Sequence, residues 1–247
     1  IMPSLVGSEM CIRDRDKDNN QNISELLRNT VSSKLKNNAA KKALVLSPHT
    51  DDAELGCGGT IAKLIEEGWK VHVIYFSAVA ERYPNLVEEA ANSGKILGIT
   101  HEVLDFHTRF FPRDRQEILQ ALYDRSRCIN YDLVFTPTTT DIHQDHGVVT
   151  AEAKRAFRNC TLLGYELPWN NLSVSLNCFI PLEERHIKKK ILALDCYDSQ
   201  KHNPYFSEKF FRSVVKMRCG LGNNSRLIIW GQGQGWSLSF LLGILLE

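Results

Sequence analysis

Residues 47–59 (SPHTDDAELGCGG) bring one histidine and two aspartates together within four positions, from His49 to Asp52. Neutral imidazole and carboxylate groups are good ligands for zinc and similar divalent cations. A bound cation would offset both the repulsion between Asp51 and Asp52 and the free-energy cost of burying them. Because His49 and Asp52 are three positions apart, one tight turn can direct both at the same point. Asp51 would then point elsewhere, where it could accept a proton.

Two other interpretations of this segment remain open when it is considered alone. Aspartates are common in loops after strands, and Asp51 or Asp52 could simply cap the next helix. The glycines at positions 56, 58 and 59 also resemble the turn of a dinucleotide or S-adenosylmethionine site. Two carboxylates beside a pyrophosphate would repel it, which argues against the nucleotide interpretation.

A second polar cluster lies at residues 136–147 (TPTTTDIHQDHG), where His143 and His146 are one helical turn apart. Taken alone, this stretch could be a helix start with Asp141 as its N-cap and two solvated histidines. Both clusters, however, follow predicted strands. Together they offer three ligands and leave one position open, which is the arrangement of a catalytic rather than a structural metal site.

The elements that must position these clusters alternate between strand and helix. Short β-favouring runs predict strands over residues 41–47, 71–76, 103–106, 133–136 and 162–167. Helical spacing of apolar residues predicts helices over residues 60–67, 85–97, 113–128, 147–157, 183–198 and 206–218. This order predicts an α/β fold with a doubly wound, mostly parallel sheet and helices on both faces. Both clusters should then open at the carboxyl edge of the sheet.

The stretches PHTDD and HQDH resemble the motifs of the LmbE-like, or PIG-L, family of zinc-dependent N-acetylglucosaminyl deacetylases. Those motifs are P-H-x-D-D-x-E and H-x-D-H, and Glu54 completes the first. The resemblance covers residues 42–218 and implies a Rossmann-like, LmbE-like fold. It also implies hydrolysis of the N-acetyl group of an N-acetylglucosamine-type sugar or glycoconjugate, which releases acetate and a free amine.

The resemblance also implies roles for individual residues. It assigns a metal ion, Zn²⁺ or another divalent ion such as Fe²⁺, to three ligands: His49, Asp52 and His146. Asp51 would be the general base. A protonated His143 would stabilise the oxyanion, and Asp145 would orient His143.

Contacts with substrate are less defined by the resemblance. Arg82, Glu166 and Trp169 are the residues that it suggests, and Trp169 or Tyr83 could stack on a sugar ring. Family members often place a tyrosine near the second motif to stabilise the same oxyanion. Residues 140–142 of this sequence are Thr, Asp and Ile, so that tyrosine is missing or is replaced from elsewhere.

The bulk composition is that of a soluble protein with one sizeable core: 247 residues, 43% hydrophobic and 24% charged. A net charge of +1 gives no indication of a nucleic-acid or membrane partner. The expected partner is a small amino-sugar conjugate, and a homo-oligomer is left open. Seven cysteines occur as scattered singles, which argues against a disulfide framework and predicts a cytoplasmic location.

The two ends of the sequence differ from the rest. LVGSEMCIRDR resembles the translation of a transposon-type sequencing adapter, so we expect residues 1–15 to be disordered extra sequence outside the fold. Residues 16–218 are predicted to form a single deacetylase domain. The glycine-rich and apolar tail at residues 219–247 is either a natural loop and strand or the product of a frame slip.

Two alternative functions remain open at the level of sequence. One is hydrolysis of a small amide that is not a sugar. The other is a non-catalytic, Rossmann-like module that binds a metal or a nucleotide. The proposed base Asp51 argues against simple binding, because binding alone requires no base.

Overall fold

The computed structural model describes residues 40–78, 82–173, 178, 180–218 and 226–227. The predictions for residues 1–15 lie outside these described residues, as does nearly all of the tail at 219–247. By its contacts, the chain from Lys41 to Glu247 forms one unit, and the fold below belongs to that unit.

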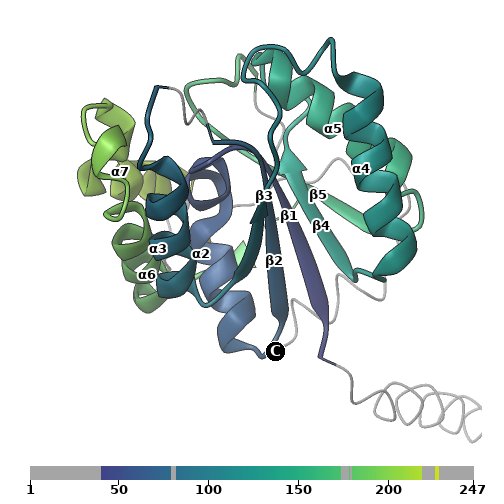
Figure 1. The fold of residues 1–247 in the computed structure, drawn as a ribbon. Helices are drawn as coiled ribbons and strands as arrows, with labels where there is room; N and C mark the ends of the chain where they lie inside the picture. The colour runs from purple at the N-terminus through teal and green to yellow at the C-terminus, as the bar shows by residue number, and fades with distance from the viewer. Residues whose placement is uncertain (1–39, 79–81, 174–177, 179, 219–225, 228–247) are drawn as a thin grey trace, which may run out of the picture. The chain divides into compact units, whose positions relative to one another are not determined.

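A five-stranded sheet with the strand order β3-β2-β1-β4-β5 forms the centre of the fold (Figure 1). All four pairings between neighbouring strands are parallel. The strands are β1 (Lys42–His49), β2 (Lys70–Ser77), β3 (Thr100–Val103), β4 (Leu133–Pro137) and β5 (Thr161–Tyr165). This arrangement confirms the predicted α/β fold with a parallel sheet.

Helices cover both faces of the sheet, as predicted (Figure 1). Four of them pack on one face: α2 (Asp52–Glu66), α3 (Leu86–Leu97), α6 (Glu184–Leu194) and α7 (Glu208–Arg218). The other face carries α4 (Arg115–Cys128) and α5 (Gln144–Ala156). Two short 3₁₀ turns, η1 (Asp198–Gln200) and η2 (Pro204–Phe206), connect α6 to α7, and β6 (Ile180–Pro181) pairs antiparallel with β7 (Arg226–Leu227).

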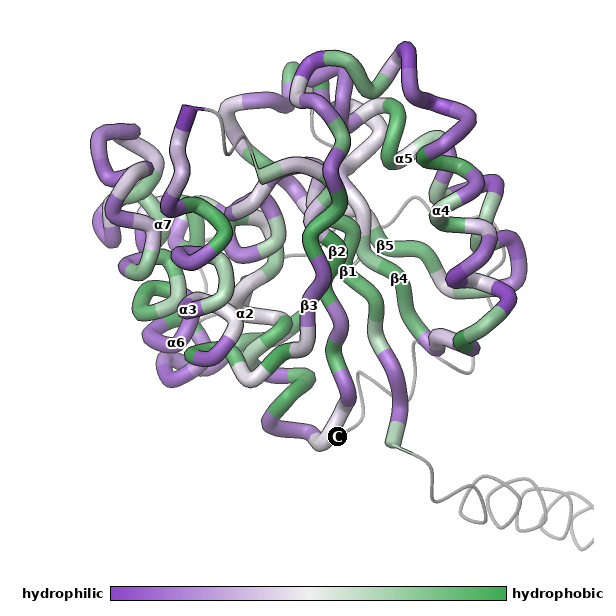
Figure 2. Tube along the Cα trace, viewed as in Figure 1, coloured by the Kyte–Doolittle hydropathy of each residue, from purple (hydrophilic) through white to green (hydrophobic). Residues whose placement is uncertain are grey.

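β1 is buried on both of its faces, which explains its continuous apolar sequence. Ala43 and Val45 belong to the core beneath α2, α3 and α6, whereas Leu44 and Leu46 belong to the core beneath α4 and α5. Figure 2 shows hydrophobic stretches on the central strands and hydrophilic stretches on the outer turns of the helices.

The order of the strands reverses at β1, because β2 and β3 extend the sheet on one side and β4 and β5 extend it on the other. At such a reversal the two crossover connections lie on opposite faces of the sheet. A crevice therefore opens beyond the carboxyl ends of the two central strands. Both polar clusters of the sequence follow these strands, β1 and β4.

The first helix begins at Asp52 rather than at the predicted residue 60, so its glycines lie inside the helix. Gly56 is required there by packing, because a Cβ atom at this position would lie 2.2 Å from Cδ2 of the Tyr165 ring. The helix also bends at Cys57, whose φ of −134° is not helical. Lys190 of α6 donates a hydrogen bond to the carbonyl of Leu55 next to this bend, at 2.6 Å.

Two further expectations differ in detail. The third strand lies at residues 100–103, three residues before the predicted position, since this short edge strand is half-exposed and gives little periodic signal. The predicted late helices are shorter, because residues 198–206 form the two 3₁₀ turns. Of the described cysteines all are free, as expected, and no helix among the described residues is long and apolar enough to span a membrane.

Candidate metal and hydrolytic site

The turn after β1 is held by a small set of short hydrogen bonds. The Ser47 hydroxyl donates to the carbonyl of His49 at 2.6 Å and accepts from the backbone N–H of Ala53 at 2.9 Å. The backbone N–H of His49 donates to Asp52 Oδ2 at 2.9 Å. Asp51, between them, has a φ of 90°, in the left-handed region that non-glycine residues seldom adopt. Unfavourable backbone angles of this kind often occur at functional sites, where they set the direction of a side chain.

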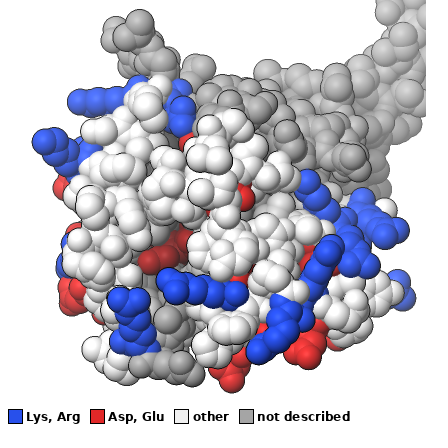
Figure 3. Space-filling model, turned by 90° about the horizontal axis from the view of Figure 1, so that it is seen from above, with Lys and Arg blue, Asp and Glu red and all other residues white. Residues whose placement is uncertain are grey.

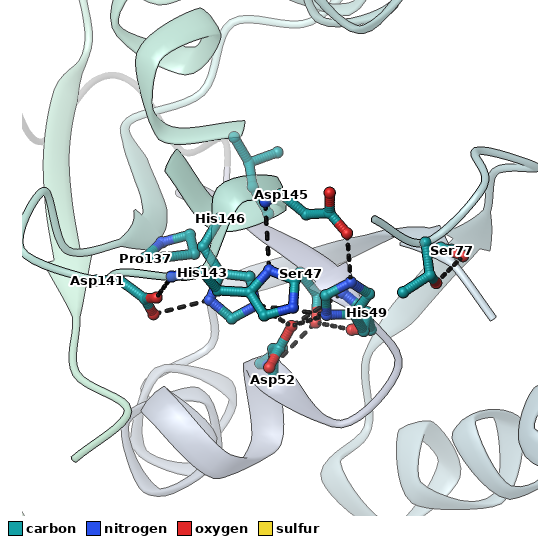
Figure 4. A network of polar contacts seen from close by, with 12 residues as sticks. Ser47, His49, Asp52, Ser77, Pro137, Asp141, His143, Asp145 and His146 are labelled. Carbon is teal, nitrogen blue, oxygen red and sulfur yellow. Dashed lines mark hydrogen bonds and ion pairs between the residues drawn. The ribbon is translucent and has the colours of Figure 1, made fainter. Parts of the chain in front are cut away.

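Three side chains from the two clusters converge on one point (Figure 4). Nδ1 of His49 lies 3.3 Å from Oδ2 of Asp52. Nε2 of His146 lies 3.3 Å from the same oxygen and 3.3 Å from Nδ1 of His49. These three atoms thus form an equilateral triangle, although His49 and His146 are 97 positions apart in the chain.

The dimensions of this triangle suit a tetrahedral cation. A cation bound by nitrogen and oxygen ligands at about 2.0–2.1 Å holds those ligand atoms about 3.3 Å apart. The structure gives 3.3 Å for all three edges. The ligand set of two imidazoles and one carboxylate is also one that catalytic zinc sites use, with the fourth position left for water or substrate.

Each histidine of the triangle is oriented by a carboxylate on its other ring nitrogen. His146 Nδ1 lies 2.7 Å from Asp141 Oδ2, and His49 Nε2 lies 3.1 Å from Asp145 Oδ2. Such partners fix the tautomer, so that the nitrogen facing the triangle is left unprotonated. The carboxylate of Asp145 thus contacts His49, whereas Asp145 contacts His143 through its backbone N–H. The carboxylate is held there by the backbone N–H of Arg109 at 2.6 Å.

The electrostatics of the triangle favour a positive charge at its centre. Burial alone lowers the pKa of His146, but the Asp52 and Asp141 carboxylates outweigh it and raise that pKa to about 10. Burial also lowers the pKa of His49, but hydrogen bonds to Asp145 and Asp52 outweigh burial and raise that pKa above its usual value. Burial acts to raise the pKa of Asp52, yet His146 and His49 lower it below its usual value. A protonated imidazole here supplies the positive charge that a cation would otherwise provide.

Asp51 has the environment of a proton acceptor with a raised affinity for protons. Burial and then the adjacent Asp52 carboxylate raise the pKa of Asp51 well above its usual value. Asp51 is the N-cap residue of α2, but its side chain makes no capping hydrogen bond, and no hydrogen bond within the described chain engages its carboxylate. These features suit a general base better than a structural cap.

His143 lies beside the triangle, with its ring stacked on His146 at 4.6 Å between centroids. Its Nδ1 accepts a hydrogen bond from the backbone N–H of Asp145 at 3.2 Å, so a neutral ring carries its proton on Nε2. Burial and the neighbouring imidazoles lower the pKa of His143. This corrects the expectation of a protonated His143, but Nε2–H of the neutral ring remains a hydrogen-bond donor.

The structure also offers a second ligand set, in which His143 takes the place of Asp52. One ligand atom from each of His49, His143 and His146 lies within 4.8 Å of the others. That spread is wider than the 3.3 Å triangle that includes Asp52. The geometry therefore favours Asp52 as the third ligand.

The three residues suggested for substrate contact differ in their burial and in the residues that they contact. Arg82 is exposed in the loop after β2, with its guanidinium over the Tyr83 ring at 5.2 Å. Glu166 is buried, and both of its carboxylate oxygens accept hydrogen bonds from Arg218. Trp169 is stacked face to face on Tyr205.

Glu54, which completes the first motif, has a structural position beneath the site. Its buried Oε1 accepts hydrogen bonds from the hydroxyls of Tyr75 at 2.7 Å, Ser93 at 2.9 Å and Tyr197 at 2.9 Å. Glu54 thereby ties the start of α2 to β2, to α3 and to the segment before η1.

Sequence reasoning missed the orienting role of Asp141, which it considered as a helix cap. The cap of α5 is instead His143, whereas Asp141 Oδ1 accepts from the backbone N–H of His143 at 2.8 Å and Oδ2 contacts His146. A carboxylate just before an H-x-D-H stretch was the available signal. No sequence signal pointed to the backbone of Arg109, whose φ of 73° turns its N–H toward Asp145.

Comparison with known proteins places both clusters in one family domain. The model of the PIG-L family, described as GlcNAc-PI de-N-acetylase, matches residues 44–157. The chain carries a PIG-L domain. The match includes β1, β4 and all residues of the metal triangle, and it confirms the resemblance that the two motifs suggested. Trp169 and Tyr205 lie C-terminal to the matched PIG-L segment.

Other comparisons find similarity over more of the chain. The "uncharacterized deacetylase YaiS" of Escherichia coli K12 is 28% identical over 172 residues, which cover 66% of this chain and 93% of YaiS. Among solved structures, the 4-carboxy-2-hydroxymuconate hydratase GalB from Pseudomonas putida KT2440 has a TM-score of 0.66 at 20% identity, covering 80% of this chain and 98% of GalB.

The N,N'-diacetylchitobiose deacetylase from Pyrococcus horikoshii has a TM-score of 0.56 at 17% identity, covering 92% of this chain and 94% of that enzyme. At such identities the structures show a shared fold. Since a hydratase and a deacetylase both have it, the reaction of this PIG-L domain must be argued from its site.

Proposed function

We propose that this protein is a metal-dependent deacetylase that hydrolyses the N-acetyl group of an N-acetylglucosamine-type sugar or glycoconjugate. The observation that carries the proposal is the 3.3 Å triangle of His49, Asp52 and His146. Asp51 and His143 flank it in positions for proton transfer and oxyanion stabilisation. The description of the PIG-L family as a de-N-acetylase supports the reaction type, and the names of YaiS and of the diacetylchitobiose deacetylase agree with it.

His49, Asp52 and His146 would hold the cation, because their three free ligand atoms have tetrahedral spacing and their outer nitrogens are already occupied by carboxylates. When bound, a divalent cation such as Zn²⁺ supplies a Lewis acid that activates water and polarises the amide carbonyl. One of the similar structures is a zinc-inhibited form of the teicoplanin deacetylase Orf2, so the choice between zinc and another divalent ion needs measurement.

Asp51 takes the proton of the attacking water. Its raised pKa makes the carboxylate a stronger base than an exposed aspartate. As the C–O bond forms, negative charge develops on the former carbonyl oxygen. His143 donates Nε2–H to that oxygen, because its Nδ1 is engaged as an acceptor and fixes the proton on Nε2.

Breaking the C–N bond requires a proton on the amine nitrogen. Asp51, protonated in the first half of the reaction, returns its proton to the leaving nitrogen, so that the cycle is balanced. The products are acetate and a free amine. A carboxyl group with a raised pKa is suited to both halves, since it can accept and release a proton near neutral pH.

The proposal is tested by metal analysis combined with acetate release on the full chain. The substrate panel contains N-acetylglucosamine, its conjugates and simple acyclic acetamides. We expect one divalent ion per chain, acetate release from the sugar substrates, loss of release after chelation and recovery on adding the metal back. Release from acyclic acetamides but not from the sugars would replace the sugar assignment with a general amide hydrolase. Metal content without any acetate release would overturn the enzymatic proposal.

A further inference from the structure

An aromatic pair from the C-terminal part of the chain is connected to the loop before the second motif. Trp169 and Tyr205 stack with 4.0 Å between ring centroids and an interplanar angle of 15°. Phe210 packs against Trp169 at 6.0 Å, and Phe206 packs against Tyr205 at 5.7 Å. Pro204 precedes Tyr205 in η2 and restricts the backbone there. These contacts restrict the movement of both rings.

The loop that carries Trp169 is fastened to the segment just before His143. The backbone N–H of Ile142 donates to the carbonyl of Asn170 at 3.0 Å, and Asp141 forms a β-bridge with Asn171. The hydroxyl of Thr138 donates to the side-chain oxygen of Asn171 at 2.6 Å. These contacts fix the aromatic pair relative to the second motif.

The other ring of the pair lies within electrostatic range of the first motif. Burial raises the pKa of Tyr205 to about 12, and the charges of Asp51 and Asp52 add to that rise. Tyr83, in the loop after β2, also contributes to it. The phenol is thus near the general base as well as near the second motif, although it is remote from both in sequence.

The Tyr205 hydroxyl has no hydrogen-bond partner within the described part of the chain, although the ring is half-buried. A phenol in this setting is both a donor and an acceptor and remains neutral at any physiological pH. Figure 3, seen from above, shows uncharged residues over the middle of this view, with Lys and Arg side chains around them and smaller areas of acidic atoms between them. A neutral phenol can exchange a hydrogen bond with a hydroxyl group of a sugar ring.

We propose that Tyr205 is a specificity-determining residue, whose hydroxyl binds a ring hydroxyl of the sugar while Trp169 holds the phenol in place. This inference rests on the proposed function and deepens it. It places the sugar against η2 and the acetamide against the metal triangle.

The test compares Tyr205→Phe with wild type on two substrates, an N-acetylglucosamine conjugate and an acyclic acetamide. Tyr205→Phe keeps the stacked ring and removes one oxygen, so the fold should be unchanged. Loss of one substrate hydrogen bond should lower kcat/KM for the sugar about tenfold, mainly through KM. The acyclic amide should be cleaved as in wild type. Tyr123→Phe, on the exposed surface of α4, is the matched control and should change neither reaction.

Equal losses on both substrates would mean that Tyr205 acts on the chemistry or the fold, and would overturn the specificity role. No change on either substrate would overturn it as well. Binding of N-acetylglucosamine by calorimetry separates this inference from the proposed function. If wild type hydrolyses nothing but binds the sugar, and Tyr205→Phe weakens binding about tenfold, the deacetylase proposal fails and the sugar contact stands.

Discussion

Replacing Asp52 should weaken metal binding and replacing His143 should leave it almost unchanged, although both side chains lie beside His146. Asp52 supplies one vertex of the 3.3 Å triangle, whereas His143 stacks beside it. The most informative variants keep the local hydrogen bonds. In Asp52→Asn the amide oxygen can still accept from the backbone N–H of His49, now at 2.9 Å from the carboxylate. In His143→Asn the side-chain oxygen can still cap α5, as Nδ1 of His143 does in the structure.

The expected magnitudes follow from the number of ligands. Four-ligand structural zinc sites bind with about 10–16 kcal/mol, or roughly 3 kcal/mol per ligand, and each 1.4 kcal/mol is a factor of about ten. Weakening the carboxylate of Asp52 should therefore lower metal affinity about 100-fold. His143→Asn should leave affinity within about threefold. It should reduce kcat by about 100- to 1,000-fold, because it removes an oxyanion donor.

The assay is a competition titration of chelator-treated protein against a chromophoric chelator, followed by acetate release from the same samples at saturating metal. His146→Ala serves as the reference for loss of a ligand. If His143→Asn lost metal as severely as His146→Ala while Asp52→Asn kept it, the site would instead use the three histidines, whose ligand atoms lie within 4.8 Å. That result would refute the reasoning from the triangle.

Three further outcomes are expected. Asp51→Asn should keep full metal content and lose at least about 100-fold in kcat, because only the base is removed; equal activity of the metal-loaded variant and wild type would remove Asp51 from this role. Burial lowers the pKa of Lys190 to about 8, against about 10.4 in an unfolded chain. Its charged form therefore destabilises the fold below pH 8, and this penalty disappears as the pH rises toward about 10.4. By urea unfolding, wild type should gain up to about 3 kcal/mol relative to Lys190→Met between pH 7 and 10, and a pH-independent difference would contradict this. Gly56→Ala should lower the free energy of unfolding by about 1–3 kcal/mol, since its Cβ would meet the Tyr165 ring at 2.2 Å. Gly147→Ala, whose Cβ meets nothing within 4 Å, should be neutral or stabilising, and equal effects of the two variants would contradict the packing argument.

The parts of the fold that could be predicted are those governed by local pattern. The apolar run from Ala43 to Leu46 predicts a strand buried on both faces, and the structure buries all four residues. Strand–helix alternation then brings the two clusters to the same edge, because parallel strands all end there. The apolar strand pattern and the common edge of parallel strands are therefore enough to predict that His49 and His146 lie close together.

The rest depended on contacts between distant segments. The glycines of α2 resemble a loop in sequence, and their place inside a helix depends on Tyr165, which packs against Gly56 from β5. Asp145 was assigned to a neighbour in sequence, yet its carboxylate contacts His49, 96 positions away. Tyr205 lies in a single 3₁₀ turn, which is too short for periodicity to show which way its ring faces.

The metal triangle joins two parts of the fold, because His49 ends β1 and Asp52 begins α2, whereas His146 lies in α5 after β4. The pairing between those parts is short, with three registered residue pairs between β1 and β4 compared with seven between β1 and β2. A cation bound by residues from both sides would stabilise the contact between β1 and β4. Removing the metal should therefore destabilise the centre of the sheet more than its edges. Amide hydrogens of β4 should then exchange faster than in the metal-bound protein.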